Sequence, residues 1–457
     1  MVHDVKMHVA VVGSGAAGLA AAWLLAKTHK VTLIEKEGRL GGHAHTATVT
    51  PETRNDGEAK PLKIDTGFIV YNEPSYPNMT RWFDAMGVDT EASDMSFAVS
   101  RDSGGFEYAG GPALGLFAQP SLLLRPRFWS MLLDLLRFYR EAPSEIPEDS
   151  TQSLGDFLRQ HRYGDAFVYD HLVPFGAAIW STPASQILDY PAAAFIRFCN
   201  NHGLLQVSNR PQWRTVSDGS EQYVAAVKQA IGHDSVKTDF DVSRIERSPS
   251  GVTIRDKKGG VVEADHVVIA AHADQALDFL AQPSDLERQL LSPFRYEDNL
   301  AYLHTDESHM PRRRRAWCSW NYVEQAGNIG DSVSLSYWMN RLQNLDSKTN
   351  YMVTLNPRQA PDAKCTFRKQ MYQHPVFTAD TWHAQQSLWQ LQGQQRTWFC
   401  GSYFGSGFHE DAVQAGLAVA EQLGGVARPW ELEQPSSRIV VPSDRMAENQ
   451  WQQEDAA

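Results

Sequence analysis

Three glycines and one acid near the N-terminus have the spacing of a site that binds the phosphates and a ribose of a dinucleotide. Gly13, Gly15 and Gly18 follow the β-branched run at residues 9–12, and Glu35 closes a second apolar run. The first glycine permits a tight turn, the second lets the backbone approach a pyrophosphate, and the third lets a helix pack closely on a strand. The carboxylate of Glu35 stands where a ribose hydroxyl needs an acceptor. The pattern therefore predicts a dinucleotide site.

The elements around this turn are those that such a site needs. Residues 8–12 and 31–34 have the composition of short buried strands, and residues 20–27 are strong helix formers. The first N–H groups and the dipole of that helix would face the phosphates. Because the glycine motif occurs once, we expect one dinucleotide rather than FAD together with NAD(P)H.

The overall composition excludes several classes of protein. The chain has 457 residues, enough for two or three domains, and its formal net charge of −12 argues against a nucleic-acid partner. No apolar run reaches the roughly eighteen residues of a membrane span. The first strand begins almost at the N-terminus, so we expect no secretion signal.

The cysteines show no metal-ligand or disulfide-dense spacing, which predicts no metal site and a cytoplasmic location. They are Cys199, Cys318, Cys365 and Cys400.

Two segments each allow two interpretations. Residues 122–139 interleave leucines and aromatic residues with Arg125, Arg127 and Arg137. This fits a helix lying on a membrane surface or a domain helix with its apolar face buried. We favour the domain helix, because amphipathic helices are usual in globular proteins. The arginine run at 312–315 fits an anion clamp or an ion-paired loop, and we favour the loop.

Strand and helix signals divide the rest of the chain. Residues 76–205 are helical and aromatic, and residues 296–395 are typical of a mixed or antiparallel sheet. A strand at 398–400 and a helix over 410–423 end the ordered part. Between residues 205 and 296 the sequence again alternates helix and strand, as it does at the N-terminus. A helix is predicted over 221–231 and strands over 236–245, 252–255 and 267–271. The chain is therefore predicted to contain a discontinuous Rossmann-like domain interrupted by α+β segments.

The chain resembles a known family. The glycine turn at 13–18, Glu35 and the stretch Arg39-Leu40-Gly41-Gly42 are similar to the FAD-dependent amine oxidase and phytoene desaturase superfamily. Within it, the chain is similar to a branch of NAD/FAD-binding proteins found beside, or fused to, cyclopropane-fatty-acid synthases. The motifs of that branch lie at residues 64–72, 201–205, 337–343 and 407–411.

The resemblance implies an amine-oxidase-like architecture of two domains with non-covalent FAD. The Rossmann-like FAD-binding domain would comprise residues 1–75, 214–290 and 396–425. The α+β substrate domain would comprise residues 76–213 and 291–395, and residues 426–457 would form a C-terminal tail. Cys400 lies near the expected flavin, but its local context differs from that of the cysteine that attaches flavin covalently in relatives.

The resemblance also implies a set of cofactor-binding residues. Glu35 would hold the adenosine ribose, the stretch from Arg39 to His43 would border the pyrophosphate or the isoalloxazine, and the backbone of Val242 would contact adenine. The N-terminus of a helix at 407–412 would face the flavin pyrimidine ring, where its dipole stabilises negative charge. The full set is Gly13, Ser14, Gly15, Ala16, Ala17, Gly18, Glu35, Lys36, Arg39, Gly41, Gly42, His43, Thr66, Gly67, Phe68, Val242, Gly401, Ser402, Gly407, Phe408, His409 and Ala412.

Two positions depart from the family pattern. Many relatives have arginine after the double glycine and an acid after the glycine of the last strand, where this chain has His43 and Ser402. Ser402 retains a hydrogen-bonding group for the ribityl chain, and His43 fits a positioning residue or a proton carrier near neutral pH. No catalytic residue is assigned; the candidates are His43, His45, Tyr337 and His409, and for each histidine we favour a structural or cofactor-positioning role.

Three functions fit this interpretation. The first is FAD-dependent desaturation or dehydrogenation of a hydrophobic acyl chain, such as a methylated or cyclopropane fatty acid, by hydride transfer to flavin N5. The second is oxidation of a small amine, and the third is a non-catalytic flavin-binding partner of a lipid methyltransferase. The expected partners are a hydrophobic small molecule or lipid, a membrane surface contacted peripherally, and such a methyltransferase. A dry, apolar wall beside the flavin would come from Trp180, Phe195, Phe198, Trp320, Tyr322, Tyr337 and Trp338.

Overall fold

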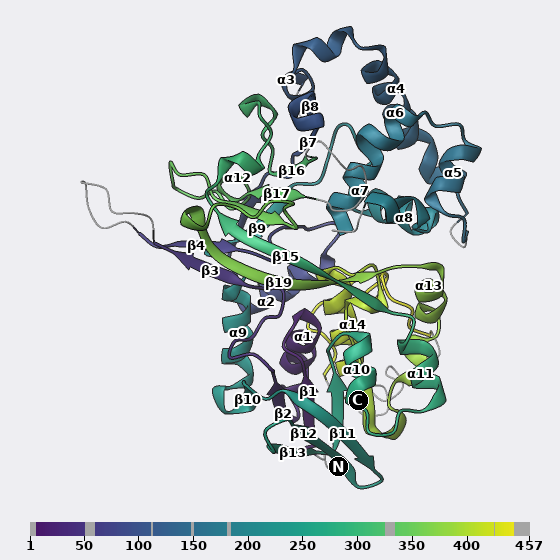
Figure 1. The fold of residues 1–457 in the computed structure, drawn as a ribbon. Coiled ribbons are helices and arrows are strands. Elements are labelled where there is room, and N and C mark those ends of the chain that lie inside the picture. Colours follow the sequence, from purple (N-terminus) through teal and green to yellow (C-terminus); the bar gives the residue numbers. More distant parts are fainter. Residues whose placement is uncertain are drawn as a thin grey trace.

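The computed structural model describes residues 6–50, 60–110, 113–147, 150–180, 184–324, 334–424 and 426–442. They form two parts stacked along one long axis, with the N-terminal strand and helix in the lower part of Figure 1 and helices α3 to α8 in the upper part. Residues 51–59, which belong to a polar stretch between Pro51 and Pro61, lie outside the described residues.

A parallel sheet of five strands lies in the lower part. Its order is β10-β2-β1-β14-β20, and all neighbouring strands run parallel. Most residues of β1, β2 and β14 are buried, as in a parallel sheet covered on both faces. The strands come from three distant parts of the chain: β1 (His8–Val12), β2 (Lys30–Ile34), β10 (Val236–Lys237), β14 (His266–Ile269) and β20 (Thr397–Phe399). The discontinuous α/β domain is thus confirmed.

Four helices that contact one another pack beside this sheet. Gly416 and Ala17 show how closely α1 and α14 approach, since a Cβ at Gly416 would lie 2.2 Å from the Ala17 carbonyl oxygen. The four helices are α1 (Ala16–Leu25), α2 (Pro77–Met86), α9 (Glu221–Ile231) and α14 (His409–Gln422). An antiparallel sheet and further helices complete this part: β11 (Val242–Ser248), β12 (Gly251–Asp256), β13 (Val261–Ala264), α10 (Ala273–Phe279), α11 (Asp285–Leu291) and α13 (Ala379–Gln385).

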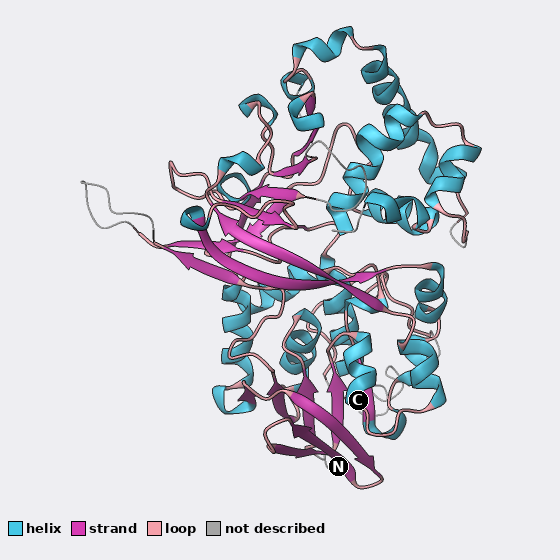
Figure 2. Ribbon diagram, viewed as in Figure 1, coloured by secondary structure: helices cyan, strands magenta, loops and turns pink. Residues whose placement is uncertain are grey.

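A sheet of seven strands supports the upper part, as the magenta arrows across the middle of Figure 2 show. Its order is β19-β15-β18-β17-β16-β7-β8, and only the β16–β7 pair among these is parallel. The predicted mixed sheet is therefore confirmed. Its strands are β7 (Phe97–Arg101), β8 (Phe106–Gly110), β15 (Arg295–His304), β16 (Trp320–Val323), β17 (Leu335–Trp338), β18 (Met352–Leu355) and β19 (Thr366–Val376).

Helices and two small sheets complete the upper part and its junction. The helices are α3 (Ala113–Leu116), α4 (Pro126–Glu145), α5 (Leu154–Gln160), α6 (Asp165–Phe167), α7 (Val173–Trp180), α8 (Ala192–Asn201) and α12 (Met339–Leu342). The small sheets pair β3 (Thr46–Val49) with β4 (Leu62–Asp65), and β9 (Trp213–Val216) with β5 (Tyr71–Asn72) and β6 (Thr90–Ser93). Among the described residues, no helix has both the length and the apolar composition needed to cross a membrane.

Two predicted boundaries differ from the packing. Helix α2 was assigned to the substrate domain, yet Trp82 and Phe83 are buried in the same core as α1, α9 and α14. Residues 426–457 were assigned to a C-terminal tail outside both domains, yet Trp430 stacks on Trp23 with centroids 5.9 Å apart, and Arg428 pairs with Glu421 at 2.7 Å. These segments belong to the lower core because their aromatic faces are covered there; residues 443–457 lie outside the described residues.

The buried carboxylate of Asp65 joins distant parts of the chain at the junction. It accepts hydrogen bonds from the Ser220 N–H at 3.0 Å, the Thr46 hydroxyl at 2.6 Å and the Gln343 side-chain amide at 3.0 Å. Strand β4 is thereby tied to the start of α9 and to the segment after α12. An unpaired carboxylate would be costly at this depth, so the three donors hold these segments in register.

Candidate functional site

The turn between β1 and α1 presents bare backbone to a large cavity. Gly13 has φ +101°, and a Cβ there would meet the Ala270 carbonyl oxygen at 2.7 Å. A Cβ on Gly18 would lie 1.9 Å from the Gly13 carbonyl oxygen, whereas nothing lies within 4 Å of a Cβ on Gly15. No side chain caps α1 and its first turn holds no acid. The N–H groups at this helix end are thus open to an anion.

Glu35 lies beside this turn at the end of β2. Its Oε2 accepts hydrogen bonds from the Ser14 N–H at 3.0 Å and the Ser14 hydroxyl at 2.5 Å, and its Oε1 accepts from the Glu37 N–H at 3.0 Å. These bonds fix the carboxylate at the rim of the cavity. Each oxygen retains acceptor capacity for a ribose hydroxyl.

The second glycine cluster folds back onto the first. Gly41 and Gly42 have φ of +113° and +57°, and a Cβ on Gly42 would come within 3.1 Å of the Gly15 Cα. The guanidinium of Arg39 donates to the Gly42 carbonyl at 3.0 Å and pairs with Glu37 at 3.1 Å. Arg39 therefore stabilises this loop. The loop places the next residue, His43, beside the turn between β1 and α1.

The start of α14 forms the opposite wall. The imidazole of His409 stacks on Phe68 with centroids 3.9 Å apart, and Phe408 stacks on Phe198 at 4.5 Å. The segment that carries Phe68 docks on the His43 carbonyl, because a Cβ on Gly67 would lie only 2.2 Å from that oxygen. Three pieces of chain, far apart in sequence, thus meet around one cavity.

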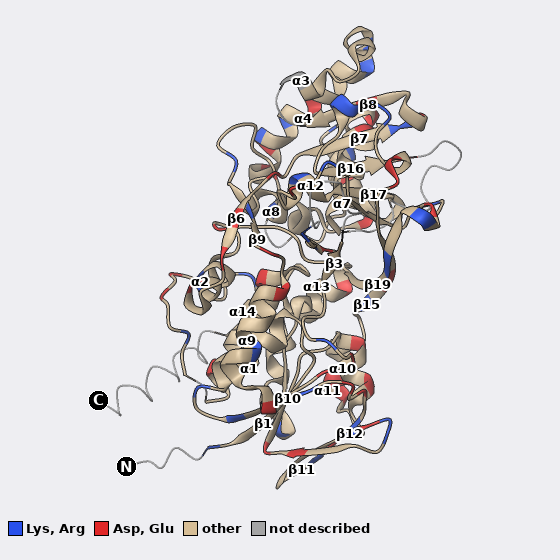
Figure 3. Cartoon of the chain, turned by 90° about the vertical axis from the view of Figure 1, so that its left-hand side faces the viewer, with Lys and Arg blue, Asp and Glu red and all other residues tan. Residues whose placement is uncertain are grey.

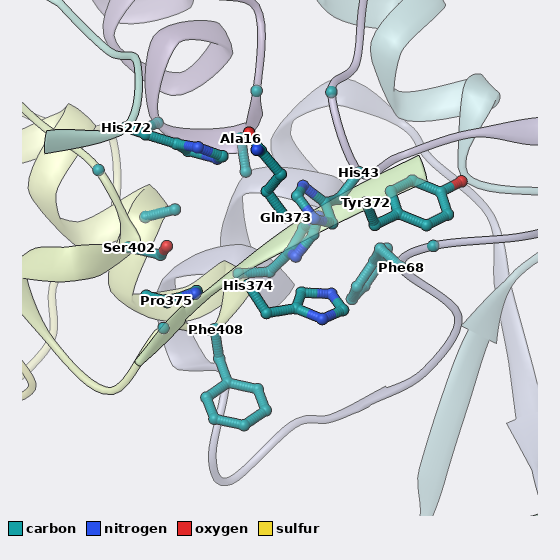
Figure 4. Close-up of a pocket in the computed structure, with 18 of the residues that line it drawn as sticks. Ala16, His43, Phe68, His272, Tyr372, Gln373, His374, Pro375, Ser402 and Phe408 are labelled. Atoms are coloured by element: carbon teal, nitrogen blue, oxygen red, sulfur yellow. The ribbon is translucent and has the colours of Figure 1, made fainter. Parts of the chain in front are cut away.

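Four half-buried histidines converge on this cavity, and Figure 4 shows three of them around the pocket. Each has one ring nitrogen without a hydrogen-bond partner: Nε2 of His43 and His409, and Nδ1 of His272 and His374. Burial lowers the pKa of His43 to about 4 and that of each of the other three to about 3. The imidazoles are therefore neutral at pH 7, and the proposed titration of His43 near neutral pH does not hold for the cofactor-free protein.

Most predicted site residues lie where the sequence placed them. All of the predicted cofactor residues line the cavity except Gly18 and Gly41, which pack behind it, and the catalytic candidate Tyr337 also lines it. His45 does not: it is buried behind the wall, where its Nδ1 lies 3.2 Å from the Tyr372 hydroxyl. The roles of the lining residues in cofactor binding stay predictions.

The predicted aromatic wall forms in part. Trp180, Phe198, Trp320 and Tyr337 line the cavity. Phe195 and Tyr322 lie in the hydrophobic core instead, and Trp338 packs edge-on against Trp317. The sequence did not predict several other lining residues. Strand β15 contributes Tyr296, and His272 follows β14. Strand β19 and the residue after it contribute Tyr372, Gln373, His374, Pro375 and Phe377. His272 had a usable signal, since ligands bind beyond the carboxyl ends of parallel strands.

These features fit FAD. The open N–H groups of α1 and the bare Gly15 suit a pyrophosphate, Glu35 suits the adenosine ribose, and Phe240 and Val242 line the end where an adenine would lie. The unpartnered imidazole nitrogens supply buried donors or acceptors that remain unsatisfied without a ligand. Cys400 is buried and is not among the residues that line the cavity.

Comparisons with known proteins agree with this site. The family described as flavin containing amine oxidoreductase matches residues 16–354. No curated protein matches significantly. A CLA-producing fatty acid isomerase from P. acnes has 15% identity over 91% of this chain and 98% of its own, with a TM-score of 0.62. Cyclohexylamine oxidase from Brevibacterium oxydans has 17% identity over 92% of this chain and 100% of its own, with a TM-score of 0.62. At such identities the solved structures establish the shared fold.

The family match covers most of the chain, including α1, Glu35 and the second glycine cluster, Gly41 and Gly42. The chain belongs to the flavin-containing amine oxidoreductase family and is an FAD-dependent oxidoreductase.

Proposed function

We propose that the protein removes two hydrogens from a hydrophobic, uncharged substrate, namely an acyl chain of a lipid. The observation that carries this proposal is that the carboxylates lining the cavity lie at one end of it and apolar side chains line the other. The carboxylates that line it among the described residues, Glu35, Glu37 and Asp241, all belong to the nucleotide end. The opposite end is lined by Ile69, Val70, Met95, Ile179, Trp180, Leu204, Trp213, Trp320 and Leu355.

Such a wall suits a hydrocarbon chain. Bound FAD would accept one of the two hydrogens as a hydride at its N5, together with the two electrons, and the other hydrogen would leave to solvent as a proton. The chain's own contribution is to hold a C–H bond in place and to exclude water, and apolar side chains perform both tasks. A cationic amine would lose its hydration in this end of the cavity and gain no carboxylate, which costs several kcal/mol.

The ring of Phe408 also supports a hydrocarbon substrate. It stacks on Phe198 at 4.5 Å and meets the edge of Trp180 at 6.4 Å. An amine oxidase is expected to present an aromatic cage beside the flavin, whereas here this ring is engaged by its neighbours. The resemblance to proteins encoded beside cyclopropane-fatty-acid synthases favours the same lipid class.

The test is an anaerobic titration of the purified holoenzyme. Phospholipids with saturated, methylated or cyclopropane acyl chains are added in one series and small amines in another, while the visible absorbance of the flavin is followed. We expect bleaching with a lipid, and a lipid product lighter by two hydrogens when an artificial acceptor is present. Bleaching by an amine, with aldehyde and hydrogen peroxide in air, would replace the proposal with amine oxidation. A flavin that neither series reduces, together with a co-purifying methyltransferase, would favour the non-catalytic role.

A further inference from the structure

The outer face of α4 and of the turn before it is unusually apolar. Leu123, Leu124, Trp129, Leu133 and Leu136 are 40%, 86%, 45%, 68% and 48% exposed, respectively. Trp129, Leu133 and Leu136 follow one another at helical spacing, so they project from one side of the helix. We call these five residues the outer stripe. Isolated exposed leucines need no explanation, but five neighbouring large apolar side chains mark an interaction surface.

Helix α4 does not need this face for folding. Its inner face already buries Phe128, Met131, Phe138 and Ala142 in the core of the helical layer. An ordinary surface helix would be polar on the other side. The expectation that the apolar face of residues 122–139 is buried is therefore half correct, because this helix has a buried apolar face and a second, exposed one.

The charge around the outer stripe is positive, although the whole chain carries −12. Residues 120–133 include Arg125 and Arg127 and no Asp or Glu. Arg125 is exposed, and Arg127 is 55% exposed while paired with Asp170. The acidic residues of α4 lie nearer its C-terminus and have partners: Asp134 pairs with Arg137, Glu141 with Arg140 and Glu145 with His161.

A second group of arginines reaches the same end of the molecule. The side chain of Gln119, just before the stripe, accepts a hydrogen bond from the Glu107 N–H and donates to the Gly105 carbonyl. Arg313 donates to the Gly104 carbonyl at 2.7 Å and pairs with Glu107 at 2.8 Å on the same hairpin. The exposed Arg312 precedes Arg313, and the exposed Arg315 follows two residues after it. Figure 3 places β8, α3 and α4 together at the end of the molecule opposite β11 and β12.

From this pattern we infer that the outer stripe docks on the surface of a bilayer that contains anionic lipid. Leucine and tryptophan side chains enter the boundary between headgroups and acyl chains, and arginines contact lipid phosphates. The indole N–H of Trp129 donates to the Leu123 carbonyl at 2.9 Å, so the turn and the helix present their apolar side chains as one unit.

The fold connects this surface to the cavity. Helix α4 packs on α8, and α8 contributes Phe198 and His202 to the cavity wall. A docked molecule would thus hold the apolar end of its cavity one helical layer from the bilayer. This inference rests on the proposed function in one respect, namely that an acyl substrate would enter the cavity from the membrane. Docking itself requires no turnover.

A second copy of the chain is the competing occupant. In a symmetric dimer through the stripe, Arg125 and Arg127 of one copy would approach the same residues of the other, and like charges oppose such contact. An anionic surface has the complementary charge. The arginines therefore favour lipid over a second copy.

The test measures binding of the holoenzyme to sedimented vesicles of phosphatidylcholine alone or mixed with phosphatidylglycerol. We expect binding to the anionic vesicles that weakens with added salt. The double variant L124D/L133D should reduce the partition coefficient at least about tenfold. Arg125→Glu should reduce it by roughly fivefold or more. Val207→Asp is the matched control, because Val207 is 69% exposed and lies outside the stripe; it should bind as the parent does.

Three results would overturn the inference. They are no binding to anionic vesicles, equal binding by the parent and by both stripe variants, and a dimer in light scattering that L124D/L133D dissociates. Flavin absorbance of each variant shows that it is folded. Since vesicle binding is measured without substrate turnover, it fails or succeeds independently of the proposed dehydrogenation.

Discussion

The imidazole of His409 lies nearly parallel to the ring of Phe68, with planes 20° apart and centroids 3.9 Å apart. His409 begins α14 near the end of the chain, whereas Phe68 follows β4 near its beginning. This stacked pair closes the cavity between the two segments. A charge on the imidazole would be desolvated there, so the neutral form is the one that fits the fold.

The half-buried histidines should make the FAD-free protein sensitive to acid. Burial lowers the pKa of His374 to about 3, from 6.5. Between these two pH values the unfolded chain binds more protons than the folded chain, so the free energy of unfolding decreases as the pH falls through the window. We expect His374→Phe to reduce this dependence by about 1.4 kcal/mol per pH unit, measured by denaturant unfolding at several pH values. His383→Phe, which removes an exposed imidazole, should leave the slope unchanged.

Binding of FAD should be coupled to proton uptake through His43. The imidazole follows the loop that contacts Gly15 and lines the cavity, and burial lowers its pKa to about 4. A pyrophosphate in the cavity raises that pKa, so protons bind with the cofactor and affinity increases as the pH falls from neutral. Titration calorimetry in buffers of different ionisation enthalpy measures the uptake.

Riboflavin and His43→Gln are the controls for this coupling. Riboflavin has no phosphate, and the glutamine does not titrate, so both should show little uptake. Equal uptake with FAD and with riboflavin would assign the proton to another group.

Gly416 should tolerate no side chain. Alanine normally stabilises a helix by about 1 kcal/mol relative to glycine. A Cβ here would lie 2.2 Å from the Ala17 carbonyl oxygen, a backbone atom that does not yield. We expect Gly416→Ala to lower the free energy of unfolding by about 1–3 kcal/mol and to weaken FAD retention, because α1 must shift. In Gly110→Ala the nearest atom is the Phe97 carbonyl oxygen at 3.5 Å, so stability should change little.

A charge in the apolar end of the cavity should impair lipid oxidation without removing the cofactor. Met95 lines that end and is half-buried. In Met95→Glu we expect the KM for an acyl substrate to rise about tenfold or more, because the carboxylate must be desolvated when the chain binds. Met95→Gln has the same length without the charge and should show a smaller rise. Steady-state kinetics and FAD content measure both effects, and an unchanged KM in Met95→Glu would contradict the placement of the acyl chain at this end of the cavity.

Local signals explain what the sequence predicted correctly. The helix at 221–231 was predicted with its observed bounds, because a turn at Asp218 and Gly219 precedes it. The glycine turn, Glu35 and the start of α14 also carry short-range signals, and they line the same cavity. These residues make contacts that depend on backbone conformations encoded locally.

The rest depends on contacts between distant segments. His374 lies in β19, and only the pairing of β19 with β15 brings it beside His43. The amphipathic pattern of α2 shows that one face is buried but not which core receives it. The two apolar faces of α4 are likewise indistinguishable in sequence, because both repeat at helical spacing. Tertiary packing decides the position of His374, the core in which α2 is buried and the face of α4 that is covered.

The late position of β20 and α14 in the chain has a consequence for biosynthesis. Strand β20 extends the parallel sheet beside β14, and α14 covers α1 through Gly416. A ribosome that has made β1, α1 and Glu35 has therefore produced only part of the FAD site, and the exposed faces of α1 and β14 stay uncovered until β20 and α14 have been made. The nascent chain carries uncovered apolar surface until then, the situation in which chaperones are most often needed.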